Sequence, residues 1–237
     1  MKKTFLIGCL TVLAMTAFVG GCKKDKDKTT TTEIPTSTFD GKITATVENG
    51  SAYNSLVKRV VAYFDESVRQ LYAVGNYANG GFTLTLPNLE GNQNLWLLTT
   101  DDADLGGINI SDKTAKTTVF DPEFYGLSST SGSVQENDVV CGFYYYSEKE
   151  GAEANPVYAD KNVTVTGSNG GNGWKEEYNV SLKKGWNWVY YRHYEENGKE
   201  MVTFTTQAVS GLKWYPSDYS HKAKKSQSRF SRLGFKK

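Results

Sequence analysis

Thiol and imidazole groups are the side chains best suited to nucleophilic or metal chemistry, and this chain has few of them. The sequence holds three cysteines, Cys9, Cys22 and Cys141, and two histidines, His193 and His221. Zinc sites need three or four such side chains converging in space, so we expect no zinc site. Cys141 lies within VVCGFYYY, which is the setting of a buried cysteine that packs as a small hydrophobe.

A catalytic triad would have to use His193. A Ser-His-Asp arrangement is arithmetically possible, but no GxSxG elbow or similar nucleophile context accompanies it. No glycine-rich loop joins a strand to a helix, so nucleotide binding has no support either. We therefore expect no enzyme and no cofactor, and an enzyme centred on His193 is the least favoured alternative.

Acidic residues suggest one candidate calcium loop. The run DDADLGG supplies Asp101, Asp102 and Asp104 before a glycine turn. Calcium takes six to eight oxygen ligands, and the further acids of the EF-hand pattern are missing here. An acidic connection between strands is the favoured interpretation, and we expect no metal.

Aromatic residues are the most informative excess. Alternate positions of WNWVYYRHY form a ladder of candidate ligand-binding residues: Trp186, Trp188, Tyr190, Arg192 and Tyr194. If the ladder is exposed, amphipathic rings with polar neighbours would stack on sugars or anchor a protein partner. The alternative, which we favour, is that these rings pack in the core, as most large aromatic side chains do.

The elements that position this ladder can be predicted from one turn. Asn197 and Gly198 suit a type I′ turn, which fixes strand pairing in a hairpin. Counting back from it places Glu196 opposite Lys199, Tyr194 opposite Met201, His193 opposite Val202, and Tyr191 opposite Phe204. One side then carries Val189, Tyr191, Val202 and Phe204, and the other carries the ladder with Thr203 and Thr205.

Apolar residues elsewhere recur with period two, which is typical of β-strands. GKITATV places Ile43, Ala45 and Val47 on one face, VVAYF places Val60, Ala62 and Phe64, and GGFTLTLP places Phe82, Leu84 and Leu86. Further candidates are NLWLLTT, KTTVF, VVCGFYYYS, KNVTVTG and EEYNVSL, separated by turn clusters at 79–81 and 167–173. No segment shows sustained helical spacing.

These patterns predict an all-β domain over residues 41–216, built as an antiparallel β-sandwich. The segments GKITATVENG and YANGGFTLTLP are similar to transthyretin-like or immunoglobulin-like (Ig-like) modules of surface lipoproteins. The resemblance implies a fold of that kind and carries over no functional residues.

The N-terminus has the layout of a secretory signal over residues 1–21. Lys2 and Lys3 precede an apolar run at 5–19, which is too short to span a bilayer. Gly20, Gly21 and Cys22 resemble the lipobox of bacterial lipoproteins, which implies acylation of Cys22 as the mature N-terminus. The alternative is an ordinary signal peptide with a cysteine near its cleavage site.

Residues 22–40 are charged and then threonine-rich, and we interpret them as a flexible tether. Eighteen residues follow Cys22 in this segment, and such a coil spans roughly 25 Å on average. The Lys-Asp run resembles the segment after the anchor cysteine in Bacteroidota-type surface lipoproteins, although its acids are interleaved with lysines. The resemblance implies an outer-membrane lipoprotein that is exposed at the cell surface. The alternative location is the periplasmic leaflet of the outer membrane. A solvated spacer explains the charges of this segment equally well.

Charge is distributed unevenly. Residues 217–237 hold seven basic residues and one acidic residue, whereas residues 41–216 hold 14 basic and 21 acidic residues. A disordered solvated tail is the favoured interpretation of 217–237. Alternatively, the tail lies on the acidic body or reaches phosphates of a polyanion such as lipopolysaccharide. Nucleic acid is not an expected partner at a cell surface.

The function expected from the sequence is a non-catalytic binding or adhesion module for a glycan or protein ligand, attached to the membrane through its N-terminal lipid. The alternative is a structural accessory subunit of an envelope assembly, such as a fimbria or a nutrient-uptake complex. The oligomeric state is left open.

Overall fold

The computed structural model describes residues 38–63, 71–98, 107–130, 136–217 and 235–236. The chain divides into two compact units, Met1–Glu33 and Ile34–Lys237, and every described residue belongs to the second. The described residues form sixteen β-strands and two short 3₁₀ turns, with no α-helix. The all-β, predominantly antiparallel class predicted from period-two spacing is confirmed.

The elements of the described residues follow in this order along the chain. They are β1 (Lys42–Thr46), η1 (Gly50–Tyr53), β2 (Arg59–Tyr63), β3 (Leu71–Ala78), β4 (Gly81–Thr85), β5 (Trp96–Leu98), β6 (Ile108–Ile110), β7 (Lys116–Thr117), β8 (Glu123–Leu127), η3 (Glu136–Asp138), β9 (Val139–Ser147), β10 (Ala152–Ala159), β11 (Val163–Gly171), β12 (Trp174–Leu182), β13 (Gly185–Glu196), β14 (Lys199–Thr205), β15 (Lys213–Ser217) and β16 (Phe235–Lys236).

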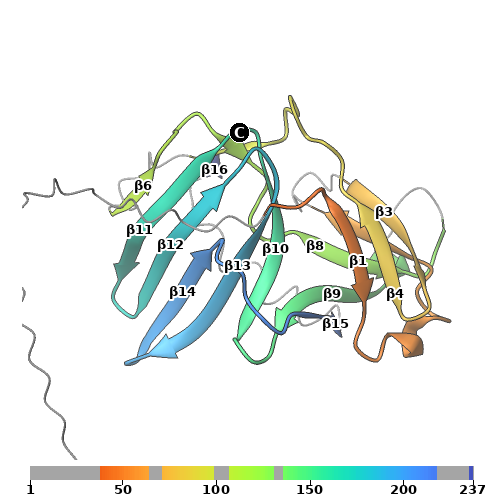
Figure 1. Cartoon of the computed structure of the whole chain (residues 1–237). Coiled ribbons are helices and arrows are strands. Elements are labelled where there is room, and N and C mark those ends of the chain that lie inside the picture. Colours follow the sequence, from red (N-terminus) through yellow and green to blue (C-terminus); the bar gives the residue numbers. More distant parts are fainter. Residues whose placement is uncertain (1–37, 64–70, 99–106, 131–135, 218–234, 237) are drawn as a thin grey trace, which may run out of the picture. The chain divides into compact units, whose positions relative to one another are not determined.

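Hydrogen-bonded pairing links most strands in the order β1-β4-β3-β2-β8-β9-β10-β13-β14-β12-β11-β6 (Figure 1). β15 adds to β9, β7 adds to β10 and β5, and β16 adds to β5. Neighbours run antiparallel except β12 and β14, which run parallel. The pair β10 and β13 lies in the middle of this order, between two groups of strands (Figure 1).

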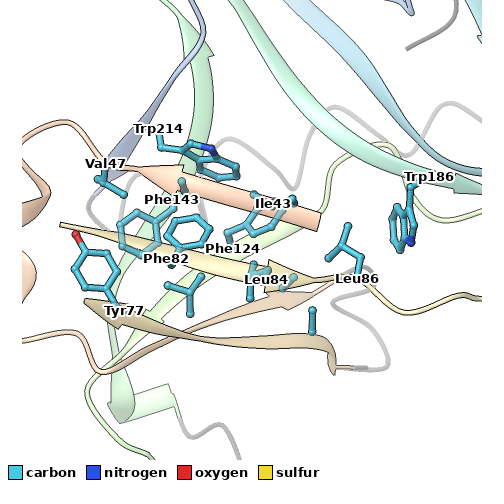
Figure 2. Packing of buried hydrophobic residues seen from close by; sticks show 14 of the residues in the cluster. Ile43, Val47, Tyr77, Phe82, Leu84, Leu86, Phe124, Phe143, Trp186 and Trp214 are labelled. Atoms are coloured by element: carbon cyan, nitrogen blue, oxygen red, sulfur yellow. The ribbon is translucent and has the colours of Figure 1, made fainter. Parts of the chain in front are cut away.

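A first hydrophobic core is formed by inward-facing residues of β1, β2, β3, β4, β8, β9 and β15 (Figure 2). The ring of Phe82 on β4 lies 5.4 Å from that of Phe143 on β9 and 5.0 Å from that of Trp214 on β15. Ile43, Ala45 and Val47 are all buried, as are Phe82, Leu84 and Leu86, so the predicted inward faces of these two segments are confirmed.

The strands around this core form a closed path. Val47 forms a parallel bridge with Trp214, and the amide of Glu48 donates to the Trp214 carbonyl at 2.8 Å. The hydrogen-bonded path from β1 through β4, β3, β2, β8, β9 and β15 therefore returns to β1. Closure of this kind satisfies backbone groups that an open sheet edge would leave exposed.

A second core lies on the opposite face of β10 and β13. Val157 and Ala159 on β10 and Val189 on β13 point into it, whereas Tyr158 and Trp186 on the same strands point into the first core. Residues of β5, β6, β11, β12 and β14 complete the second core. The strand pair β10–β13 thus separates the two cores and contributes side chains to both.

The predicted hairpin is confirmed in its turn and in its register. Asn197 and Gly198 both have positive φ, 53° and 71°, as a type I′ turn requires. Glu196 pairs with Lys199, Tyr194 with Met201, His193 with Val202, and Tyr191 with Phe204.

The glycine cluster at 167–173 is an exception to the predicted turns. Strand β11 continues through Gly171, and its turn into β12 is formed by Asn172 and Gly173. A Cβ atom on Gly167 would lie 2.0 Å from the carbonyl oxygen of Gly107, so the glycine permits a close approach of two backbones. The turn prediction for 167–171 was therefore wrong. The glycines in this range belong to strand β11, where glycine allows another backbone to approach closely.

Candidate binding face

The structure buries two residues of the predicted aromatic ladder. Trp186 is 5% exposed, donates its indole N–H to the Pro87 carbonyl at 2.9 Å, and contacts the ring of Tyr158 edge-on. Tyr190 is also 5% exposed. Both side chains face inward along β13, so neither can contact a ligand at the surface. For these two positions the core interpretation is the correct one.

Trp188 is half-buried because another part of the chain covers it. The ring of Phe39 stacks on it, with centroids 4.7 Å apart and an interplanar angle of 18°. The Phe39 amide donates to the Trp186 carbonyl at 3.2 Å, and Thr38 forms a bridge with Asn187. Residues assigned to the tether by sequence therefore pack on β13.

The last two members of the ladder lie toward the hairpin turn. Arg192 is half-buried, with its Nη2 3.1 Å from the Glu150 carboxylate. Tyr194 is 41% exposed. The ladder therefore passes from core to solvent along one strand, and it does not form a continuous aromatic surface.

A different group of aromatic side chains does reach the surface. On β9, Phe143 and Tyr145 pack toward the first core, so Tyr144 and Tyr146 lie on the opposite face. On β15, Trp214 is likewise buried, which places Tyr215 on that same outer face, directly opposite Tyr144. We call Tyr144, Tyr146 and Tyr215 the tyrosine face; all three are half-buried.

The ring of Tyr144 contacts the rings of both Tyr215 and Tyr146. Tyr144 and Tyr215 are stacked, with centroids 5.6 Å apart and an interplanar angle of 26°, and Tyr144 lies 6.0 Å from Tyr146. These contacts hold the rings in fixed orientations on two hydrogen-bonded strands. Few side-chain rotamers remain to be ordered when a ligand binds, which favours affinity.

A second tyrosine pair lies on the same side of the sheet. Phe124 on β8 pairs with Phe143, and both are buried, so Tyr125 points outward. Its ring lies 5.8 Å from that of Tyr63 on β2, and its hydroxyl donates to the Glu123 carboxylate. Aromatic side chains thus recur across β2, β8, β9 and β15.

Carboxylates surround the tyrosine face. Burial raises the pKa of Tyr144 above its ordinary value, and the negative charges of Glu153 and Glu148 raise it further. Burial also raises the pKa of Tyr215, again with a contribution from Glu148. Both phenols are therefore protonated at neutral pH and able to donate a hydrogen bond.

The histidine, the acidic run and the cysteine considered from the sequence are not arranged as a catalytic or metal site among the described residues. His193 has its Nε2 2.7 Å from the Glu200 carboxylate on the neighbouring strand. No group of His, Cys, Asp and Glu suited to a metal occurs among the described residues, and Asp101, Asp102 and Asp104 lie outside them. Cys141 is 2% exposed and belongs to the first core, which confirms it as a buried core side chain.

Cys22 and most of the basic tail also lie outside the described residues. No helix in the described part of the chain is long and apolar enough to cross a bilayer. Comparisons with protein families, with curated proteins and with solved structures find no match to this chain.

Proposed function

We propose that this chain is a non-catalytic binding module, held at the bacterial outer membrane by lipid on Cys22, and that it binds its ligand on the tyrosine face. The observation that carries the proposal is the contact of Tyr144 with both Tyr146 and Tyr215 on the outer side of β9 and β15. Glycan and protein ligands both suit a surface of this chemistry.

The tyrosine face combines two properties of binding surfaces. A tyrosine ring supplies a large apolar area, and its hydroxyl supplies a directed polar group. The supporting strand β9 is paired to β8 on one side and to β15 on the other. Side chains on such paired strands keep their positions better than side chains on loops.

The proposed location rests on the order of features at the N-terminus. A positive start, an apolar run, two glycines and Cys22 occur in the order that lipoprotein processing requires. The segment after Cys22 would then separate the folded body from the lipid headgroups. A surface ligand could reach the tyrosine face without competition from the membrane.

The proposal can be tested with a panel of immobilised glycans and peptides of graded charge. We expect the purified protein to retain at least one member, and the double variant Tyr144→Ala/Tyr215→Ala to lose at least about tenfold in affinity for it. Tyr194→Ala, which changes an exposed tyrosine away from this face, is the matched control. Equal retention by wild type and double variant would rule out the tyrosine face as the binding surface.

A structural role in an envelope assembly is the second candidate. The edge strand β6 favours it, because β6 ends the pairing order and pairs only with β11 among the described strands. An exposed edge can accept a strand from another protein. A photo-crosslinking residue at the exposed position Asn109 would report a stoichiometric protein neighbour in cells if this candidate is right.

A further inference from the structure

The tyrosine face has an acidic border formed by three elements. Glu153 on β10 pairs directly with Tyr146. Glu148 follows β9, and its charge acts on both Tyr144 and Tyr215. Glu48, next to β1, also acts on Tyr215, and the positive charge of Lys213 opposes it there.

The basic side chains around this border are already engaged. Lys213 Nζ lies 3.0 Å from the Glu48 carboxylate. Lys149 and Arg192 both lie near Glu150, at 3.8 Å and 3.1 Å. Glu148, in contrast, is exposed and makes no ion pair with another described residue.

The sequence from residue 41 to residue 216 has the same sign of net charge. Residues 41–216 hold seven more acidic than basic residues. An acidic surface attracts cationic ligands over a distance set by salt and repels phosphate-bearing ligands. The electron-rich faces of tyrosine rings also attract lysine and arginine side chains.

We infer that the tyrosine face binds a cationic polypeptide segment of another protein, rich in lysine or arginine. Guanidinium or ammonium groups would lie over the rings of Tyr144 and Tyr215 and pair with Glu148 and Glu153. The inference rests on the proposed function and narrows its ligand class. A cationic ligand excludes phosphorylated glycans from the ligand classes of the proposed function. Neutral glycans are the alternative that the test below distinguishes.

The test measures binding of fluorescein-labelled deca-arginine to the purified protein by fluorescence anisotropy. Deca-glutamate and a neutral linear glucan serve as comparison ligands. We expect deca-arginine alone to bind, with affinity at least about tenfold weaker at 300 mM than at 50 mM salt, because the ion pairs are screened. Deca-glutamate should not bind at either salt concentration.

Three variants locate the site. Tyr215→Leu keeps apolar volume but removes the aromatic face, and we expect a loss of about fivefold in affinity. Glu148→Gln removes a charge at an exposed position and should reduce both affinity and its salt dependence. Tyr194→Ala should bind like the wild type.

Several outcomes overturn the inference. If the neutral glucan binds and Tyr215→Leu abolishes that binding, the proposed function stands and the cationic ligand is wrong. If no ligand responds to Tyr215→Leu, the tyrosine face is not a binding surface and both proposals fail. If deca-arginine binds only after the basic residues at 222–232 are changed to glutamine, the occupant is the chain's own tail and not another protein.

Discussion

The aromatic ring of Phe39 lies nearly parallel to the indole of Trp188, with centroids 4.7 Å apart. Phe39 comes just before β1 in the chain, whereas Trp188 lies near the middle of β13. The contact therefore joins the start of the folded body to strand β13, which lies between the two cores. It also covers Trp188, the ladder tryptophan that is only partly buried.

Replacing Phe39 by alanine should uncover Trp188. Loss of the partly buried ring and its stacking should lower the free energy of unfolding by about 1–2 kcal/mol. Urea denaturation would measure the loss, and a red shift of tryptophan fluorescence would report exposure of the indole. Leu56→Ala, which changes a side chain that is 52% exposed, is the control and should alter neither. An unchanged emission spectrum in Phe39→Ala would contradict the contact.

A side chain at Gly75 should be strongly destabilising. A methyl group there would lie 2.0 Å from the carbonyl oxygen of Thr83, which belongs to the backbone of β4 and cannot rotate away. We expect Gly75→Ala to cost about 2–3 kcal/mol of stability. Gly91→Asn is the control, because Gly91 has φ 72° with no atom near its Cβ position and asparagine tolerates that conformation. Thermal unfolding of both variants checks the difference.

Stability should fall at high pH through Tyr77. Its hydroxyl donates to the Gly50 carbonyl at 2.8 Å, and burial raises the pKa of Tyr77 from 10.0 to about 12. The folded state holds this proton more tightly than the unfolded chain does. The protonated Tyr77 hydroxyl therefore contributes fully to the free energy of unfolding below pH 10, and this contribution is lost as pH rises through about 12.

The variant Tyr77→Phe isolates this effect. At pH 8 we expect it to be about 1 kcal/mol less stable than the wild type, because the hydrogen bond to Gly50 is lost. The difference in stability between the two proteins should shrink at pH values above 10. There the Tyr77 hydroxyl of the unfolded wild type loses its proton, which lowers the stability of the wild type, whereas phenylalanine has no proton to lose. Urea denaturation at several pH values measures the gap. A gap that stays constant up to pH 12 would show that Tyr77 does not titrate as described.

Membrane attachment should depend on Cys22. We expect the wild type to fractionate with membranes and Cys22→Ser to appear in the soluble fraction, since buried acyl chains contribute about 0.8 kcal/mol per CH₂. Intact-mass spectrometry of the wild type should show the added acyl groups. An unmodified mass in the wild type would remove the basis for the proposed location.

Local sequence rules predicted the hairpin correctly, because its turn chemistry acts over a few residues. Asn197 and Gly198 can adopt positive φ, and that requirement alone sets which residues of β13 and β14 face each other. Alternation likewise predicted that Ile43 and Phe82 share an inward side in β1 and β4, because each strand has one apolar and one threonine-rich face.

Several strands escaped prediction for a physical reason. Strand β10 is buried on both faces and contains Pro156, so it shows neither alternation nor the usual strand composition. Strand β15 is short and has a single buried aromatic side chain, Trp214. A strand between two cores cannot be distinguished from a general apolar segment by periodicity.

The sequence by itself determined the class of fold, the hairpin register and the inward faces of the segments that became β1 and β4. Only the tertiary structure decided which face of β9, β13 and β15 meets a core. Burial is set by what packs against a surface, and both Phe39 over Trp188 and Tyr215 beside Tyr144 come from segments distant in the chain. For that reason two residues of the predicted ladder, Trp186 and Tyr190, became core, and the tyrosine face is formed by residues for which the sequence predicted no binding role.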